Sequence, residues 1–323
     1  MITQKQPWKN DVAVLSIFWA RPDIFRQSFA RIREARPRIL LLWQDGPRKN
    51  RPDDMKNILA CREIAENIDW ECEIYRNYHS ENMGCDPSTH LSHKWAFSIV
   101  DKCIILEDDV IPSLSFFSFC TELLNRYEYD WRIDRICGLN LLETYETGSD
   151  YFFARFGNST GWASWRRVAE TWDTEYNFLG NKYALSLLSQ AYNNAHKFQR
   201  WIQKCKKHQS EGIPYWEEIV GTRTLLQGGL VIYPTKNLIN NIGFGLNSAH
   251  TPNELKEISN KRIYSMKTYE YSIPLKHPRY MMADDRFIQK AAATLQTPFT
   301  SRINYLFKPR KYKKLIKKIL RKL

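Results

Sequence analysis

The chain has 323 residues, of which 43% are hydrophobic and 14% aromatic, so it can bury a sizeable core as one large or two modest domains, and disorder is excluded. Its net charge is +13, but nine basic and no acidic residues lie between Lys308 and Lys322, leaving +4 on residues 1–307. This distribution argues against nucleic acid as a partner of the main body. The seven cysteines form no Cys-x-x-Cys pair, which predicts a reduced, cytoplasmic setting. No segment approaches the roughly 18 apolar residues of a membrane span.

Strand and helix patterns alternate four times in the first part of the chain. Apolar runs of strand length are each followed by a segment with apolar residues at helical spacing. The predicted strands cover 12–19, 38–44, 71–78 and 102–109, and the predicted helices cover 24–35, 53–68, 86–100 and 111–127. Such an alternation predicts an α/β fold with a mostly parallel, Rossmann-like sheet covered on both faces. Ligands of these sheets bind beyond the carboxyl ends of the strands.

The second half of the chain is less regular. It contains a predicted strand at 135–142, an aromatic stretch at 151–172, a basic amphipathic helix at about 182–207 and a strand at 228–234. Pro112 is predicted in the first turn of the helix that follows the fourth strand, where proline is tolerated. We therefore expect three parts: residues 1–112, residues 113–302 and a basic tail at 303–323.

Three acidic side chains, Glu107, Asp108 and Asp109, follow the fourth predicted strand directly. Like charges at adjacent positions repel, so they need a cation, basic partners or open water nearby. One interpretation is a solvated strand end that caps the next helix. The other is a site for Mg²⁺ or Mn²⁺, which prefer oxygen ligands and share their coordination with phosphates.

A set of motifs between residues 11 and 251 extends this interpretation. The set comprises QDG (44–46), NMG (82–84), ILEDDVIPSLSFFSFC, GNSTGWASWRR, YWEE and GGLVIYPTKNLINNIGFGLNSAHT. In this order they resemble the bacterial nucleotide-diphospho-sugar transferases of the GT-A fold and, more remotely, N-acetylglucosaminyltransferase I. The resemblance implies a GT-A type sheet and an acceptor-binding second half. It also implies a metal-dependent, inverting glycosyltransferase that uses a UDP-linked sugar and a glycan or lipid-linked acceptor, as in polysaccharide biosynthesis.

The resemblance also implies roles for individual residues. The acidic triplet corresponds to the family's DXD motif, so Asp109 would bind the metal while Asp108 and Glu107 lie towards the sugar and ribose. The other implied positions are Arg21, Asp45, Asn82 and Gly84 at the nucleotide, Gly161 and Trp162 at the acceptor, and Ser248 and His250 at the diphosphate and metal. Each has a plainer interpretation: a solvated arginine, two turns, core packing of the tryptophan, or a hydrogen-bonded histidine.

Inverting transfer needs a base that removes the proton of the acceptor hydroxyl. The YWEE motif offers Glu217 and Glu218, and counting back from Pro234 leaves both possible. The alternative interpretation is a surface helix with glutamates in its first turn.

Two other functions remain open from the sequence. A nucleotidyltransferase that makes nucleotide sugars also needs a parallel sheet and carboxylates, but it usually has a glycine-rich loop after the first strand, and FWARPD has no glycine. A non-catalytic protein docked to a membrane is the third possibility. In the tail, Leu315, Ile316, Ile319, Leu320 and Leu323 fall on one helical face with basic residues opposite. This pattern predicts a peripheral position on the anionic inner face of the cell membrane.

Overall fold

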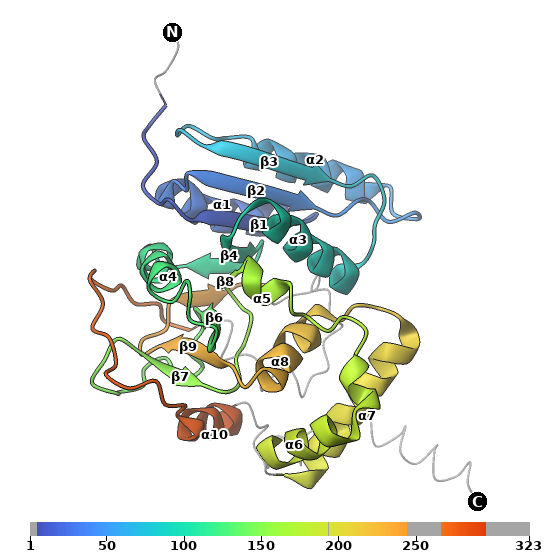
Figure 1. Cartoon of the computed structure of the whole chain (residues 1–323). Coiled ribbons are helices and arrows are strands. Elements are labelled where there is room, and N and C mark those ends of the chain that lie inside the picture. Colours follow the sequence, from blue (N-terminus) through green and yellow to red (C-terminus); the bar gives the residue numbers. More distant parts are fainter. Residues whose placement is uncertain (1–4, 193, 244–265, 295–323) are drawn as a thin grey trace, which may run out of the picture.

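The computed structural model describes residues 5–192, 194–243 and 266–294. An eight-stranded sheet with the strand order β3-β2-β1-β4-β8-β6-β9-β7 runs through the protein, and a two-stranded sheet joins β10 to β5 (Figure 1). The strands are β1 (Ala13–Phe18), β2 (Ile39–Gln44), β3 (Glu73–Tyr78), β4 (Lys102–Glu107), β5 (Val110–Pro112), β6 (Ile133–Cys137), β7 (Tyr151–Ala154), β8 (Trp162–Trp165), β9 (Leu230–Pro234) and β10 (Ile239–Asn241). The helices are α1 (Pro22–Ala35), α2 (Asp53–Ala65), α3 (Cys85–Ile99), α4 (Ser115–Arg126), α5 (Arg166–Ala169), the short 3-10 helix η1 (Asn177–Gly180), α6 (Lys182–Tyr192), α7 (Ala195–Glu211), α8 (Trp216–Leu226) and α10 (Asp285–Thr294).

Strands β1 to β4 form the parallel half of the sheet. Their apolar sequences are explained by helices on both faces, which bury the side chains that point in either direction. Ile17 of β1 is in register with Trp43 of β2 and with Glu107 of β4, so the carboxyl ends of these strands meet at one edge. The prediction of an α/β fold with a mostly parallel sheet covered by helices is confirmed.

The sheet continues across the predicted boundary at residue 112. Strand β8 pairs antiparallel with β4 on one side and with β6 on the other. Strand β9 is parallel to β6, and β7 is antiparallel to β9 at the edge. Both predicted halves therefore contribute strands to one sheet.

Two apolar clusters lie on opposite faces of the sheet. One packs α1, α2 and α4 against it, with Phe25, Phe29 and Phe119 among its buried side chains. The other packs α3, α6, α7 and α8 and contains Phe97, Trp162 and Trp216. A smaller cluster attaches α10 to β7 and β9. The clusters fix α3 and α8 beside the carboxyl ends of β1 and β4.

The helix predicted at 111–127 begins later than its sequence suggests. Pro112 belongs to β5, where it lies opposite Ile239 of β10, and α4 begins at Ser115. The backbone N–H groups of Leu114 and Ser115 donate to the carboxylate of Glu270, at 3.1 and 2.7 Å. The prediction of Pro112 in a helix was wrong because both the strand partner and the cap come from segments far along the chain.

Two further predicted elements differ in extent. The single helix at 182–207 is two helices, α6 and α7, and Asn194 caps the second by accepting a hydrogen bond from Lys197 N at 2.8 Å. The strand at 135–142 ends at Cys137, after which Gly138 N donates to Gly161 O at 2.8 Å. The tail at 303–323 lies outside the described residues.

Candidate functional site

Seven of the predicted site residues come from four chain segments at the carboxyl ends of the parallel strands. Arg21 follows β1, Asp45 follows β2, Asn82 and Gly84 follow β3, and the acidic triplet ends β4. The parallel pairing of β3, β2, β1 and β4 brings these ends side by side. Arg21 is thereby within hydrogen-bond distance of Asp109, which lies 88 residues later in the sequence.

Arg21 bridges the two aspartates of the triplet. Its Nε donates to Asp108 Oδ2 at 3.2 Å, and its Nη2 donates to Asp108 Oδ1 and, at 3.1 Å, to Asp109 Oδ2. Burial disfavours the charged guanidinium, but the two carboxylates outweigh this effect and raise the pKa of Arg21. The sequence left open a cation, basic partners or water around these acids, and the structure provides a basic partner.

The triplet has more carboxyl groups than Arg21 can pair with. Burial raises the pKa of Glu107 well above its usual range, and repulsion from Asp109, Glu217 and Asp108 adds to this effect. Burial also raises the pKa of Asp108, although Arg21 opposes the shift. One guanidinium therefore faces several carboxylates, and the site favours additional positive charge.

The end of β10 and the two residues after it contact Asp109. Asn241 Nδ2 donates to Asp109 Oδ1 at 3.2 Å, and Ile242 N donates to the backbone carbonyl of Asp109 at 2.9 Å. A Cβ on Gly243 would lie 2.0 Å from Asp109 Oδ2, so a side chain there would displace the Asp109 carboxylate. Sequence reasoning missed Asn241 and Gly243, although the NNIGFG run after a strand indicated a close backbone approach. Ser248 and His250, further along this segment, lie outside the described residues.

Asp45 anchors the turn that contains Asn82 and Gly84. Its carboxylate accepts hydrogen bonds from Met83 N at 2.9 Å, Gly84 N at 3.1 Å and Asn82 Nδ2 at 3.0 Å. Burial raises the pKa of Asp45, and the backbone N–H groups oppose that shift. Gly84 has a φ of +89°, which favours glycine immediately before α3. Asp45, Asn82 and Gly84, the predicted nucleotide-binding residues that follow β2 and β3, are thus joined by hydrogen bonds.

The two glutamates of YWEE have different surroundings. Glu218 Oε1 accepts from Trp201 Nε1 at 2.5 Å, and its Oε2 pairs with Lys204, which ties α8 to α7. Glu217 is more exposed and lies near enough to Glu107 and Cys85 to raise the pKa of both. Of the two candidates for the base, Glu217 is therefore the one beside the acidic triplet.

Cys85 is a site residue that sequence reasoning did not single out. It is the exposed one among the seven free cysteines. Desolvation and the nearby Glu107, Asp86 and Glu217 raise the pKa of its thiol to about 12. Its place as the first residue of α3, directly after the NMG motif, was the available signal.

Gly161 and Trp162 pack against residues that neighbour the site. The Trp162 side chain is 1% exposed and stacks on Trp216 with ring centroids 6.4 Å apart. Gly161 has a φ of +59°, and a Cβ there would meet Ile239 and Val110. Trp162 thus positions Trp216, the residue before Glu217.

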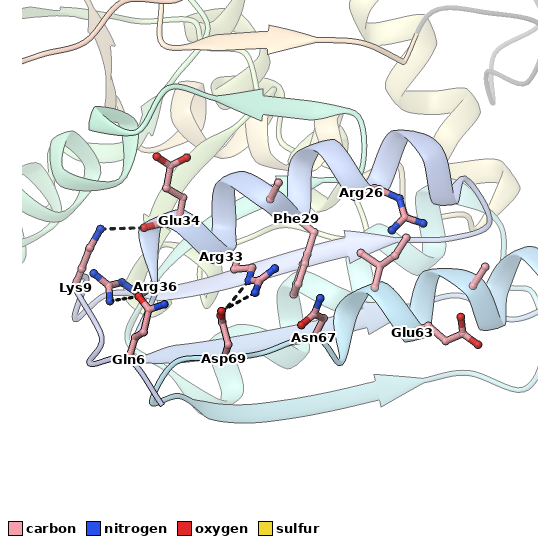
Figure 2. Close-up of a pocket in the computed structure, with 13 residues that line it drawn as sticks. Gln6, Lys9, Arg26, Phe29, Arg33, Glu34, Arg36, Glu63, Asn67 and Asp69 are labelled. Carbon is pink, nitrogen blue, oxygen red and sulfur yellow. Dashed lines mark hydrogen bonds and ion pairs between the residues drawn. The ribbon is translucent and has the colours of Figure 1, made fainter. Parts of the chain in front are cut away.

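Two hollows lie outside the acidic triplet. A groove of about 710 Å³ runs between α1 and α2, where Arg33 pairs with Asp69 and Arg36 with Gln6 (Figure 2). A pocket of about 520 Å³ adjoins Asn82 and is lined by Arg48, Lys49 and Arg51 from the loop after β2. The second hollow lies next to the turn that Asp45 anchors, because Asn82 lines the hollow and donates to Asp45.

Carboxylate oxygens of the triplet suit a hard divalent cation. Within the described ranges, no three His, Cys, Asp or Glu side chains form a complete metal-binding group. Asp108 and Asp109 nevertheless converge on one cationic group, the guanidinium of Arg21. The residues therefore fit a metal that takes one or two protein carboxylates and completes its shell from a bound phosphate.

No protein-family model and no curated protein matches the chain. Among solved structures, the chain is similar to a UDP-glucose pyrophosphorylase in complex with UDP-glucose, with 8% identity and a TM-score of 0.35 over 70% of this chain and 91% of that one. It is also similar to 4-diphosphocytidyl-2C-methyl-D-erythritol synthase from Anaerococcus prevotii DSM 20548, with 11% identity and a TM-score of 0.29 over 49% of this chain and 73% of the other.

Proposed function

We propose that the protein is a metal-dependent, inverting glycosyltransferase. It would transfer a sugar from a UDP-linked donor to a hydroxyl group of a glycan or lipid-linked acceptor. The observation that carries this proposal is the meeting of Arg21, the acidic triplet and Glu217 at the carboxyl edge of the parallel strands. Ligands of open α/β sheets bind at this edge.

The donor is expected to lie along the edge from β3 to β4. The anchored turn at Asp45 and Asn82 would bound the nucleoside, and the diphosphate would lie towards Arg21 and Asp109. A divalent metal held by Asp109, with Asp108 beside it, would neutralise the diphosphate as it leaves. Arg21 can exchange a carboxylate for a phosphate oxygen, because both accept the same paired hydrogen bonds.

Glu217 is the proposed general base. A carboxylate can remove the proton of an acceptor hydroxyl when it is correctly placed, and Glu217 is the exposed carboxylate beside the acidic triplet. Glu218 is already bound by Trp201 and Lys204, so its proposed role is to hold α8 in place. The stacked side chains of Trp162 and Trp216 would hold the start of α8, and with it Glu217, in position.

The experiment is a panel of nucleotide sugars incubated with the protein and Mn²⁺, with release of the nucleoside diphosphate as the readout. Release that requires Mn²⁺ and stops in Asp109→Asn supports the proposal. A parallel assay supplies nucleoside triphosphates and sugar phosphates. Pyrophosphate release in that assay, without turnover of nucleotide sugars, would favour the nucleotidyltransferase instead. A protein that binds no nucleotide diphosphate by calorimetry, with or without Mn²⁺, is the outcome expected of a non-catalytic docking protein.

A further inference from the structure

Four large apolar side chains stand in solvent near the amino ends of β6 and α10. Tyr129 and Trp131 lie in the loop between α4 and β6, and Tyr280 and Met282 lie in the segment before α10. Their exposed fractions are 86%, 60%, 65% and 75%, in the same order. Arg132 Nη2 lies 3.1 Å from Met281 Sδ, so the two segments are in contact. These four side chains are called the aromatic patch below.

Basic residues flank the patch along the chain, and Arg279 contacts it directly. Arg126, Lys276 and Arg279 are exposed, and none of them forms an ion pair with a described residue. The guanidinium of Arg279 lies 5.4 Å from the ring centroid of Tyr280. Two acidic neighbours are bound by arginines: Asp130 pairs with Arg132, and Asp284 pairs with Arg286. The carboxylate of Asp150 lies beside Lys276 and accepts a hydrogen bond from its backbone N–H. The patch therefore combines aromatic surface with the guanidinium of Arg279.

We propose that the aromatic patch docks the folded body of the protein onto an anionic lipid bilayer. Tyrosine and tryptophan favour the boundary between headgroups and acyl chains, because one end of each ring system is apolar and the other is polar. Each basic residue beside an anionic leaflet adds about 1 kcal/mol of attraction, screened by salt. A glycan is a poorer occupant, because sugar hydroxyls need free acceptors beside the rings and the adjacent carboxylates are engaged by arginines.

Two other observations agree with a bilayer as the occupant. No helix within the described ranges is long and apolar enough to cross a membrane, so contact through the body would be peripheral. In the sequence, the basic tail with its nine positive charges follows α10, whose first residue is three positions after Met282. The tail thus follows the patch in the sequence, with α10 between them.

The patch also predicts an orientation. The loop with Tyr129 and Trp131 enters β6 at its amino end, whereas the acidic triplet follows the carboxyl end of β4. Strands β4 and β6 are both antiparallel to β8, so they run in the same direction. The amino end of β6 and the carboxyl end of β4 therefore lie at opposite ends of the strands. A protein docked through the patch presents the proposed site to the aqueous phase, where it would meet the sugar end of an acceptor.

The test uses the full chain with an environment-sensitive fluorophore at position 280, in Tyr280→Cys on a Cys85→Ser background. The matched control carries the label on α6, in Tyr183→Cys, because Tyr183 is 73% exposed but lies away from the patch. We expect a blue shift at position 280, and none at 183, with vesicles of phosphatidylcholine and phosphatidylglycerol. Vesicle-bound protein without a shift at 280 would overturn the proposal, as would a shift caused by a soluble polysaccharide alone.

A second measurement compares vesicle binding of two unlabelled variants. Trp131→Ser/Tyr280→Ser/Met282→Ser should bind anionic vesicles about tenfold more weakly than the parent. Tyr183→Ser/Leu187→Ser, which removes exposed apolar groups of α6, should bind like the parent. Equal vesicle binding by all three proteins would show that the patch does not bind the membrane, and would leave the tail as the candidate for membrane binding. Melting temperatures check that the variants are folded.

Discussion

Nη2 of Arg21 lies 3.1 Å from Oδ2 of Asp109, and the same nitrogen donates to Asp108. A guanidinium therefore contacts Asp109, the residue that the family resemblance assigns to a metal, as well as its neighbour Asp108. Both cations answer the same need, which is to offset adjacent negative charges in a partly buried site. Arg21 and a metal bound to Asp109 should consequently influence each other.

Removal of Arg21 should destabilise the fold and increase its dependence on a metal. Arg21→Met leaves Asp108 buried without its partner, at a cost on the order of 3 kcal/mol. Mn²⁺ should raise the melting temperature of this variant more than that of the parent. Arg33→Met is the matched control, since Arg33 pairs with Asp69 on the surface and such pairs contribute about 1 kcal/mol or less. Equal effects of Mn²⁺ on the parent and Arg21→Met would contradict the idea.

Asp109→Asn should abolish metal-dependent nucleotide binding and leave the fold intact. The amide keeps the shape of the side chain but removes the charge that a divalent metal requires. Calorimetry with UDP and Mn²⁺ measures the loss. Asp285→Asn, on the exposed first turn of α10, is the control and should bind as the parent does. Near-normal turnover of Asp109→Asn at the same Mn²⁺ concentration would make the assignment wrong.

Glu217→Gln and Glu218→Gln should fail in different ways. Loss of a general base typically lowers the rate by about a hundredfold to ten-thousandfold, so Glu217→Gln should lose turnover while its affinity for nucleotide persists. Glu218→Gln weakens the contacts with Trp201 and Lys204, so it should chiefly lower the melting temperature. Thermal melts and rates on both variants separate the two roles. If Glu217→Gln stays active, the base must be sought elsewhere.

The sequence predicted the parallel half of the fold well because its signals are local. Apolar runs of strand length alternate with amphipathic helices, and the strands end at Gln44, Tyr78 and Glu107, next to the predicted site residues. The same property brought Arg21 and Asp109 together correctly, since parallel strands share an edge. Both predictions needed only the local sequence of each strand and of the residues that follow it.

Features that depend on distant segments could not be read in this way. Nothing local to Pro112 indicates that it faces Ile239, and nothing near Ser115 indicates the cap from Glu270. The choice between Glu217 and Glu218 depends on Lys204, which belongs to another helix. The residues proposed for metal, base and acceptor stay predictions until they are tested in solution.

Cys85 offers a direct probe of occupancy at the site. Desolvation and the nearby charges of Glu107 and Glu217 raise the pKa of its thiol to about 12, which keeps the reactive thiolate scarce at neutral pH. Alkylation at pH 8.5 should therefore be slow but measurable by mass spectrometry. UDP with Mn²⁺ at about ten times the dissociation constant should slow it about tenfold, because bound protein is protected in proportion to ligand saturation. An unchanged rate with bound UDP would show that the nucleotide lies away from α3.

The most buried histidine of the described residues predicts how stability depends on pH. His93 of α3 is fully buried, with its ring 4.9 Å from Trp216 and 5.2 Å from Trp162, centroid to centroid. Neither ring nitrogen has a hydrogen-bond partner among the described residues. Desolvation, with a smaller contribution from His90 on the same helix, lowers the pKa of His93 to about 3. The tryptophans around it carry no charge that could offset a proton.

Below pH 6.5 the unfolded chain protonates His93, whereas the folded protein keeps it neutral down to about pH 3. Stability attributable to this residue is therefore complete above pH 6.5 and falls by about 1.4 kcal/mol per pH unit below it. His93→Phe keeps an aromatic ring in the cluster and removes the titration. Urea unfolding at pH 7.5 and pH 5.0 should show the parent losing about 2 kcal/mol more than this variant between the two values. His90, with a pKa of about 4, stays in both proteins, so its own acid sensitivity cancels in the comparison. Parallel pH profiles for the parent and His93→Phe would mean that water or movement of α3 relieves the buried imidazole.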